Sequence, residues 1–459
     1  MVTSELHACL ADALGPSAVS SANAERELHS HDESIFPPVM PDVVVWPTST
    51  AHVVEIVKIA AQAGEPITGW GVASSSEGHA IPIRQGIVVD FSRMDKVLAV
   101  HAEDFQATVQ PGVLRLSLEK QLSQYGLFFA PDPGANASVG GMIANNAAGI
   151  RAHKYGATRA NVLALEVVLA NGDVIRTGSR SIKQSSGYDL TRLMIGSEGT
   201  LGLVTEATLV LHPVPEHFAT AVVGFRSVTE AAHAAYGIIG SGLAPAALEI
   251  MHQDHIKYMN EDEGSDWPEV PTLMIEFTGS SKIAIGEAME EAQSICRDSG
   301  ASEFTSGLDH SGRKEMWEMR HGARHRYRRR APGRLWTALD VSVPISHLAE
   351  IIEYAERCAV DLALPGKVLG HAGDGNIHMG IGYTPGNVDE QHRASELSRL
   401  IVEKALELEG TASGEHGIGL GKRKYMVAEH GAEAVEAMRS IKQALDPHNL
   451  LNPGKILPD

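Results

Sequence analysis

Cysteine is scarce in this 459-residue sequence. The three cysteines, Cys9, Cys296 and Cys358, lie far apart and form no C-x-x-C motif. An odd number of cysteines without paired spacing disfavours a disulfide framework, an iron–sulfur cluster and a zinc site built from thiolates. A reducing compartment fits this usage, so we expect the protein to be cytoplasmic.

Long apolar runs and a basic N-terminal region are also missing. No apolar run approaches the roughly 20 residues that a membrane span needs. The first twelve residues, MVTSELHACLAD, carry acidic side chains and no basic segment ahead of an apolar stretch. Neither a signal or transit peptide nor a membrane span is therefore predicted.

Basic side chains are fewer than acidic ones. The formal net charge is -19 at pH 7, which repels phosphate backbones, so nucleic-acid binding is not expected. Hydrophobic residues make up 43% and charged residues 21% of the chain, which is typical of globular proteins. The length suggests two to three domains.

The apolar pattern predicts two regions of different character. In the first, helices are predicted at residues 1–32 and 51–64, and strands at 43–46, 87–91, 107–110 and 202–211. A hairpin is predicted between 162–169 and 174–176, with Asn171-Gly172 at its turn. After Pro215, strands at 218–225, 273–277 and 339–343 alternate with helices rich in alanine and glutamate, and a last helix at 439–447 ends at a proline.

Two glycine-rich stretches dominate the first region: residues 69–79, GWGVASSSEGH, and residues 131–149, PDPGANASVGGMIANNAAG. Loops of this composition expose backbone N–H groups and short hydroxyls, which cradle a pyrophosphate. They could also serve only as tight turns. Two such loops between predicted strands favour a dinucleotide site.

The motifs of two common nucleotide-binding folds are absent. No G-x-G-x-x-G follows a strand and opens a helix. Residues 417–423, GIGLGKR, fail the phosphate-loop spacing and place Arg423 where a serine or threonine would hold magnesium. A nicotinamide or ATP site is therefore disfavoured.

A candidate metal centre lies near the C-terminus. Residues 370–378, GHAGDGNIH, contain His371 and His378 around a glycine-rich turn, and residues 414–417, GEHG, follow downstream. Two histidines and Glu415 with open coordination positions suit zinc, and manganese or iron also tolerate them. His416 could then move a proton.

The only strongly basic run begins at Arg320, and Arg320, Arg324 and Arg328 share one helical face. Arginine binds carboxylates bidentately, so Arg320 is the predicted substrate anchor, with Arg324 as a further cation. A solvated basic face is the alternative for most of residues 326–334. His321 and His325 have metal-ligand spacing but no adjacent acidic ligand.

Several motifs together resemble a known superfamily. The stretches PDPG at 131–134, SVGG at 138–141, YG at 155–156, GYDL at 187–190 and GSEGTLG at 196–202 resemble, in order and spacing, the FAD domain of the vanillyl-alcohol oxidase/p-cresol methylhydroxylase superfamily. LDP at 445–447 and NPGK at 452–455 resemble its C-terminal region. HAGDGNIH with GEHG is similar to the D-2-hydroxyacid dehydrogenase branch, which includes FAD-dependent D-lactate dehydrogenase, the glycolate oxidase catalytic subunit and D-2-hydroxyglutarate dehydrogenase.

This resemblance implies an α+β fold. It would comprise a p-cresol-methylhydroxylase-type FAD-binding domain at 1–215, a substrate or cap domain with an antiparallel sheet at 216–410, and a segment at 411–459 that returns to the FAD domain and completes the active site. FAD would be bound non-covalently, because His79, the only nearby attachment candidate, lies at the end of the loop and not at the usual attachment place. Where the branch usually has glycine and threonine, this chain has Ala73 and Ser74.

The resemblance also assigns residues. It makes His371, His378 and Glu415 the metal ligands and His416 the catalytic base. Arg320, Arg324 and Asn376 would bind the substrate, and Arg320 would also be catalytic. The expected FAD-binding residues are Trp70, Gly71, Val72, Ser74, Ser75, Glu77, Gly78, His79, Pro131, Asp132, Gly134, Ser138, Gly140, Gly141, Asn145, Ala148, Gly149, Glu198, Gly199, Val204 and Asn452.

The implied reaction is oxidation of a D-2-hydroxy acid, D-lactate first, to the 2-oxo acid, with hydride passing to flavin N5. Electrons would then leave for an external acceptor, namely a cytochrome, a quinone or an electron-transfer protein. Two other enzymes remain as alternatives, the glycolate oxidase catalytic subunit and D-2-hydroxyglutarate dehydrogenase. A non-redox flavin- or metal-binding module is the alternative outside them, and a homodimer is left open.

Overall fold

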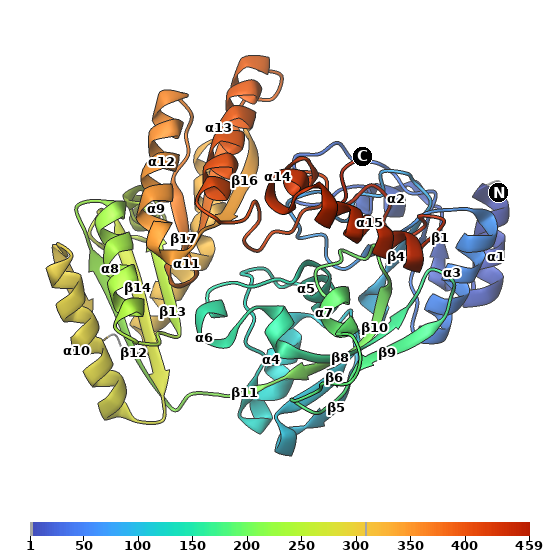
Figure 1. Cartoon of the computed structure of the whole chain (residues 1–459), viewed down its shortest axis with the longest axis horizontal. Helices are drawn as coiled ribbons and strands as arrows, with labels where there is room; N and C mark the ends of the chain where they lie inside the picture. Colours follow the sequence, from blue (N-terminus) through green and yellow to red (C-terminus); the bar gives the residue numbers. More distant parts are fainter. Residues whose placement is uncertain (1–2, 308–309) are drawn as a thin grey trace. The chain divides into compact units, whose positions relative to one another are not determined.

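The computed structural model describes residues 3–307 and 310–459 (Figure 1). The chain divides into two compact units. The first unit comprises residues 1–148, 156–214 and 415–459, and the second comprises residues 149–155 and 215–414. Each is described by itself below.

The first unit contains a four-stranded sheet in the order β1-β2-β4-β3, in which β2, β4 and β3 run parallel. The central strands are short runs of valine and isoleucine buried on both faces, as parallel sheets require. Helix α3 packs its apolar side against the residues of this sheet. The Ser49 hydroxyl caps the start of α3, and Gly64 ends it with a φ of 70°. The bounds are β1 Val19–Ser20, β2 Val43–Val45, β3 Ile67–Trp70, β4 Ile87–Asp90 and α3 Thr50–Ala63.

The helix predicted over residues 1–32 is interrupted. Helix α1 (Thr3–Leu14) ends before Gly15, whose φ of 90° no helix can continue. A short 3₁₀ turn (Pro16–Ala18), β1 and helix α2 (Asn23–Leu28) follow. Leu6, Leu10 and Leu14, the residues that carried the helical periodicity, are buried together against the sheet.

A second, antiparallel sheet in the first unit has the order β5-β6-β10-β8-β9. The predicted hairpin is confirmed: β8 pairs with β9 around a turn where Gly172 has a φ of 84°. A two-stranded sheet joins β7 to β11. The bounds are β5 Val97–His101, β6 Gln106–Val109, β7 Leu127–Phe128, β8 Val162–Val168, β9 Val174–Gly178, β10 Leu203–Val210 and β11 His212–Pro213.

The remaining helical elements of the first unit are short, except at its C-terminal end, where the predicted helix is α15 (Figure 1, red). The α-helices are α4 Arg115–Leu122, α5 Val139–Asn145, α7 Leu190–Met194, α14 Met426–His430 and α15 Ala432–Leu445. The 3₁₀ turns are Phe91–Arg93, Ala102–Asp104, Ser123–Tyr125, Thr158–Asn161 and Arg423–Tyr425.

The last residues of the chain extend the first sheet. Leu451 forms a parallel bridge with Ile67 of β3, and the two backbones exchange hydrogen bonds on either side of it. Asp446, which is 1% exposed, accepts hydrogen bonds from Lys442 Nζ and from the backbone N–H groups of Leu450 and Leu451. This buried carboxylate fixes the turn that carries the chain from α15 back to the sheet.

The second unit is built on a seven-stranded sheet in the order β15-β12-β14-β13-β17-β18-β16, in which every pairing is antiparallel. The antiparallel sheet expected for a cap domain is therefore present. The bounds are β12 His217–Gly224, β13 Ala247–Met251, β14 Thr272–Gly279, β15 Glu303–Ser306, β16 Leu335–Ser342, β17 Val368–His371 and β18 Asn376–Tyr383.

Helices cover both faces of this sheet. On one face, α9 and α11 share an apolar cluster with Met251 of β13 and Met274 of β14. On the other face, α10 packs against β12 and β14 and α12 packs against β17, while α8 and α13 pack against α12. The bounds are α6 Ala152–Tyr155, α8 Val228–Gly240, α9 Gln253–Glu263, α10 Lys282–Asp298, α11 His310–Arg330, α12 Leu348–Asp361 and α13 Val388–Glu407, with 3₁₀ turns at Ile345–His347 and Ala372–Asp374.

The basic end of α11 is solvated only in part, since Arg329 and Arg330 are exposed whereas Arg326 is buried. Arg326 is only 6% exposed and pairs with Glu263, and Arg329 and Arg330 pair with Asp262. Acidic residues at the C-terminal end of α9 thus neutralise this run. The expectation of a solvated basic face is wrong for Arg326, because α9 lies alongside α11 on the same sheet face.

None of the helices in the described part of the chain is both long and apolar enough to cross a membrane.

Replacing Asp446 with alanine should lower the free energy of unfolding by about 3–5 kcal/mol, because Lys442 and two backbone N–H groups lose a buried partner. Urea unfolding measures the change. The matched control is Glu436→Ala on the preceding helix α15, where an exposed pair with Arg439 is lost, with an expected change within about 0.5 kcal/mol. Equal losses in the two variants would contradict this role for Asp446.

Candidate active site

A tight hairpin brings the two histidines together. His371 ends β17, a 3₁₀ turn follows, and β18 begins at Asn376, so that His371 and Asn376 are paired across the hairpin. Gly375 in the turn has a φ of 70°, and a Cβ there would lie 2.0 Å from the carbonyl oxygen of Val343. Only glycine fits this close approach. The rings of His371 and His378 stand 5.1 Å apart between centroids, nearly perpendicular to each other.

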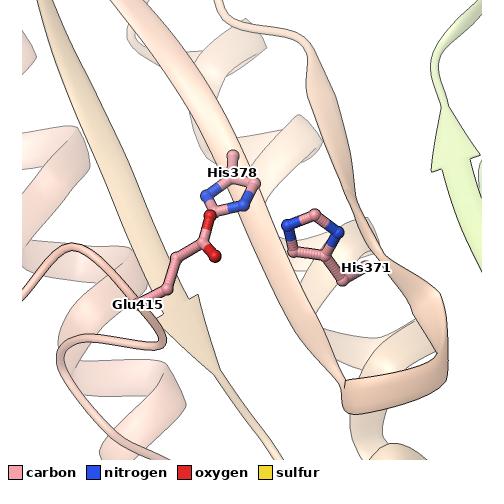
Figure 2. A group of neighbouring side chains, drawn as sticks. All are labelled: His371, His378 and Glu415. Atoms are coloured by element: carbon pink, nitrogen blue, oxygen red, sulfur yellow. The ribbon is translucent and has the colours of Figure 1, made fainter. Parts of the chain in front are cut away.

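Glu415 directly follows a segment that is tied to the same sheet. Thr411 exchanges backbone hydrogen bonds with Ser342 of β16, and Ser413 Oγ donates to Asp340 Oδ2 at 3.1 Å. One ligand atom from each of His371, His378 and Glu415 lies within 4.8 Å of the others. In Figure 2 the Glu415 carboxylate and the His371 ring both approach the His378 ring. The three predicted ligands are thus brought together.

The donor set fits a divalent metal. Two imidazole nitrogens and one carboxylate oxygen leave coordination positions for other ligands, as in catalytic rather than closed structural zinc sites. Among the described residues, no second group of three such side chains comes as close. His321 and His325 are both exposed on α11, outside this group.

Two fully buried carboxylates, neither of them predicted, support the histidines. Glu249 of β13 places Oε1 2.7 Å from His371 Nδ1, and Asp340 of β16 places Oδ1 3.5 Å from His378 Nδ1. Both are 0% exposed. A sequence signal exists, since each is a lone acid within an otherwise apolar strand, where a charge is rarely buried unless it is paired.

Asn376, predicted to meet the substrate, uses its amide nitrogen internally. Its Nδ2 donates to Asp340 Oδ1 and to the carbonyl oxygen of Val341, both at 2.8 Å. Its Oδ1 is buried without a hydrogen-bond partner among the described residues. Any contact of this side chain with a ligand would therefore run through an acceptor, which suits a hydroxyl group rather than a carboxylate.

Arg320, the predicted carboxylate anchor, lies on α11 and is 9% exposed. Its Nε donates to Glu249 Oε2 at 2.6 Å, and this is its only hydrogen bond within the described residues. The two Nη groups keep the planar donors that bind a carboxylate bidentately. The side chain of Arg324 lies outside the described residues.

The two glycine-rich loops of the first unit meet each other. The first runs irregularly from β3 towards β4, and the second contains α5, whose start is capped by Ser138 Oγ accepting from Gly141 N–H. A Cβ at Gly71 of the first loop would lie 2.4 Å from Ser138 Oγ of the second. Ala73 has a φ of 50°, in the left-handed region that glycine adopts without strain, which matches the glycine expected there.

The predicted FAD-binding residues separate by burial. The residues that are at least partly exposed include no aspartate or glutamate. They are Gly71, Val72, Ser74, Ser75, Gly134, Gly140, Gly141, Asn145, Ala148, Gly199 and Val204. The buried ones are Trp70, Glu77, Gly78, His79, Pro131, Asp132, Ser138, Gly149, Glu198 and Asn452. Gly149 groups with the second unit rather than the first.

Each acid among the predicted FAD-binding residues lies near a basic side chain. Glu77 lies 3.6 Å from Lys422 Nζ, Asp132 lies 3.4 Å from Arg115, and Glu198 lies 3.2 Å from His79 Nε2. The loops therefore offer backbone N–H groups and small hydroxyls, with their negative charges buried and compensated. That donor set fits a pyrophosphate and hence FAD.

Glu198 and Asn452 also hold the C-terminal segment. Glu198 accepts from the N–H groups of Ile418 and Gly419, and Asn452 Nδ2 donates to the carbonyl oxygens of His79 and Glu198. Burial by itself lowers the pKa of His79, but the Glu198 charge outweighs it and the net pKa is raised. Burial likewise raises the pKa of Glu198, while His79 and the two N–H groups bring the net pKa below its usual range.

Comparison with known families identifies the chain. The FAD-linked oxidase C-terminal domain matches residues 214–456, and an FAD-binding domain matches residues 41–178. The chain belongs to the FAD-linked oxidases. The first match covers more than half of the chain, and the resemblance inferred from the motifs is confirmed.

Relatives of this FAD-linked oxidase span almost its whole length. It is 41% identical to "D-lactate dehydrogenase (cytochrome), mitochondrial" of Arabidopsis thaliana, covering 95% of this chain and 77% of the relative. It is also 41% identical to a probable mitochondrial D-lactate dehydrogenase of Danio rerio, covering 96% and 90%. A glycolate oxidase subunit of Bacillus subtilis is 35% identical, covering 99% and 97%.

Solved structures support the fold of the oxidase. A 4-ethylphenol oxidase from Gulosibacter chungangensis superposes with a TM-score of 0.82 at 19% identity, covering 99% of this chain and 97% of the other. p-Cresol methylhydroxylase superposes with a TM-score of 0.80 at 19% identity and the same coverage. The predicted p-cresol-methylhydroxylase-type α+β fold is therefore confirmed.

Replacing His371 with alanine should remove the bound divalent metal, because one of three protein ligands is lost. Elemental analysis of purified wild-type and variant protein measures metal per flavin. His392→Ala, an exposed histidine on α13, is the control and should keep the metal. Unchanged metal content in H371A would refute the assignment of this ligand.

Proposed function

We propose that this FAD-linked oxidase catalyses metal-assisted oxidation of a D-2-hydroxy acid, with D-lactate as its substrate, to the 2-oxo acid. The observation that carries the proposal is the His371–His378–Glu415 group in a chain that carries an FAD-binding domain. Relatives at 35–41% identity that are named D-lactate dehydrogenases support the substrate class.

The proposed reaction requires both FAD and a divalent metal. Bound FAD would accept the hydride that leaves Cα, which is the redox step that no side chain can perform. A bound divalent cation, zinc first and manganese or iron as alternatives, would acidify the substrate hydroxyl as it acidifies water. His371, His378 and Glu415 would hold that cation, and the glycine-rich loops would hold FAD non-covalently.

Four further side chains have proposed roles. His416, next in sequence to Glu415, would take the hydroxyl proton as general base. Arg320 would bind the substrate carboxylate through its Nη groups, while Nε remains on Glu249. Asn376 Oδ1 would accept a hydrogen bond from a hydroxyl, and Arg324 would add positive charge.

Electrons would then pass to an external acceptor. All three cysteines are free and distant in sequence, so they hold no cluster that could serve as a second redox centre. A cytochrome is the acceptor we propose first, since the names of several relatives specify one. The same cysteine usage supports a reducing compartment, which we propose to be the cytoplasm.

Glycolate oxidation is the second candidate. The glycolate oxidase subunit of Bacillus subtilis matches over 97% of its own length. The name of that protein marks it as a subunit, so glycolate oxidation predicts weak activity of the isolated chain and a gain on adding partner subunits. The order of flavin reduction rates with D-lactate, glycolate and D-2-hydroxyglutarate separates the candidates.

Anaerobic addition of D-lactate to the purified flavoprotein should bleach the visible absorbance of the flavin, because the flavin is the electron sink. L-lactate is the control and should leave the spectrum unchanged. Absence of bleaching by any of the 2-hydroxy acids above, in protein that contains both flavin and metal, would refute the proposed function.

Replacing His416 with alanine should lower the rate of flavin reduction by about 10²–10⁴-fold, the usual contribution of a general base. FAD and metal content should stay at wild-type levels, because His416 is not among the proposed ligands. Stopped-flow absorbance measures the rate. A rate within threefold of wild type would exclude His416 as the base, whereas loss of flavin would show a structural role instead.

A further inference from the structure

The fully buried carboxylate of Glu249 serves two partners at once. Its Oε1 lies 2.7 Å from Nδ1 of His371, and its Oε2 accepts a hydrogen bond of 2.6 Å from Nε of Arg320. These come from separate elements: His371 from β17, the strand paired with β13, and Arg320 from the helix packed on that sheet face. One carboxylate therefore joins a proposed metal ligand to the proposed substrate anchor.

The strand register explains why Glu249 reaches both. Glu249 and His371 are direct cross-strand partners, so their side chains leave the same face of the sheet side by side. Met251, two residues on and thus on the same face, packs in the apolar cluster that α11 also enters. Arg320 projects from α11 into this layer and meets the carboxylate there.

The bond to His371 selects the metal-binding nitrogen. An ionised carboxylate only accepts hydrogen bonds, so Nδ1 of His371 must carry the hydrogen. The lone pair then resides on Nε2, which is the nitrogen left for a metal. Carboxylates that hold the second ring nitrogen in this way fix the tautomer and orientation of metal-bound histidines.

We infer that Glu249 is a positioning residue that sets both the tautomer of His371 and the position of Arg320, and so couples metal affinity to recognition of the substrate carboxylate. The inference rests on the proposed function, in which His371 binds the metal and Arg320 binds the substrate. Glu249 itself touches neither metal nor substrate.

The isosteric variant Glu249→Gln prevents the side chain from accepting hydrogen bonds from His371 and Arg320 at the same time. A glutamine has one acceptor oxygen and one donor nitrogen, so it cannot accept from both Nδ1 of His371 and Nε of Arg320. If the amide nitrogen faces His371, the imidazole must place its hydrogen on Nε2 and cannot bind the metal in that form. If it faces Arg320 instead, two donors oppose each other and the guanidinium is displaced.

Glu276→Gln is a matched control. Glu276 lies on the neighbouring strand β14, two residues along the same sheet face, and is 5% exposed. It also binds an arginine of α11, since Arg313 donates to both its oxygens and Trp317 Nε1 donates to Oε2. Neither Arg313 nor Trp317 is a proposed metal ligand. The control removes the same charge from the same layer without touching His371.

The experiment measures zinc affinity of the flavin-loaded, metal-stripped protein by competition with a chromophoric chelator, alongside KM and kcat for D-lactate. The dissociation constant for zinc in E249Q should rise by about 10–100-fold, the usual effect of losing such a partner. KM should rise when zinc is saturating, while E276Q should keep the zinc affinity of wild type within threefold.

Wild-type zinc affinity in E249Q would overturn the inference and leave the proposed function standing. Equal loss in E249Q and E276Q would also overturn it, because the cause would be general weakening of the sheet. Absence of zinc binding in the wild type would instead refute the metal site itself. If E249Q fails to fold, Glu249→Asp is used: it keeps the charge, is too short to reach both partners, and should lose zinc affinity or raise KM.

Discussion

The register of the antiparallel sheet in the second unit decides which polar side chains can meet. Glu249 lies opposite His371, and His378 lies opposite Asp340, because β13, β17, β18 and β16 are hydrogen-bonded at those positions. Side chains in a strand alternate between faces, so a slip of one residue would send a histidine to the opposite face from its carboxylate.

The metal ligands could be predicted from sequence more readily than their support. His371 and His378 flank a glycine-rich turn, which is a local pattern, and Gly375 supplies the conformation that closes it. Glu249 and Asp340 are distant in sequence from both histidines and become their neighbours only through strand pairing. Local spacing carries no information on such pairing, although a lone acid in an apolar strand indicates a buried partner.

Other differences from the sequence-based expectations have the same origin. The periodicity of Leu6, Leu10 and Leu14 describes one helix correctly, but it does not reveal that Gly15 ends that helix. The sequence predicts a solvated basic face over most of residues 326–334, but Arg326 is buried because α9 lies beside α11 and brings Glu263 to it. The hairpin at Asn171-Gly172 was predictable because its signal lies within two residues. In the first unit, Glu198 and Asn452 are predicted to bind FAD, and the structure adds that their hydrogen bonds tie the C-terminal segment to this unit, which no local sequence pattern indicates.

The central claim is that a metal held by His371, His378 and Glu415 assists oxidation of a hydroxy acid by bound flavin. The most direct measurement compares the rate of flavin reduction by D-lactate in metal-stripped protein and in the same protein after zinc is restored, with flavin content held equal. The account predicts a rate lost on stripping and recovered with zinc, manganese or iron. Equal rates in the stripped and restored protein would contradict it.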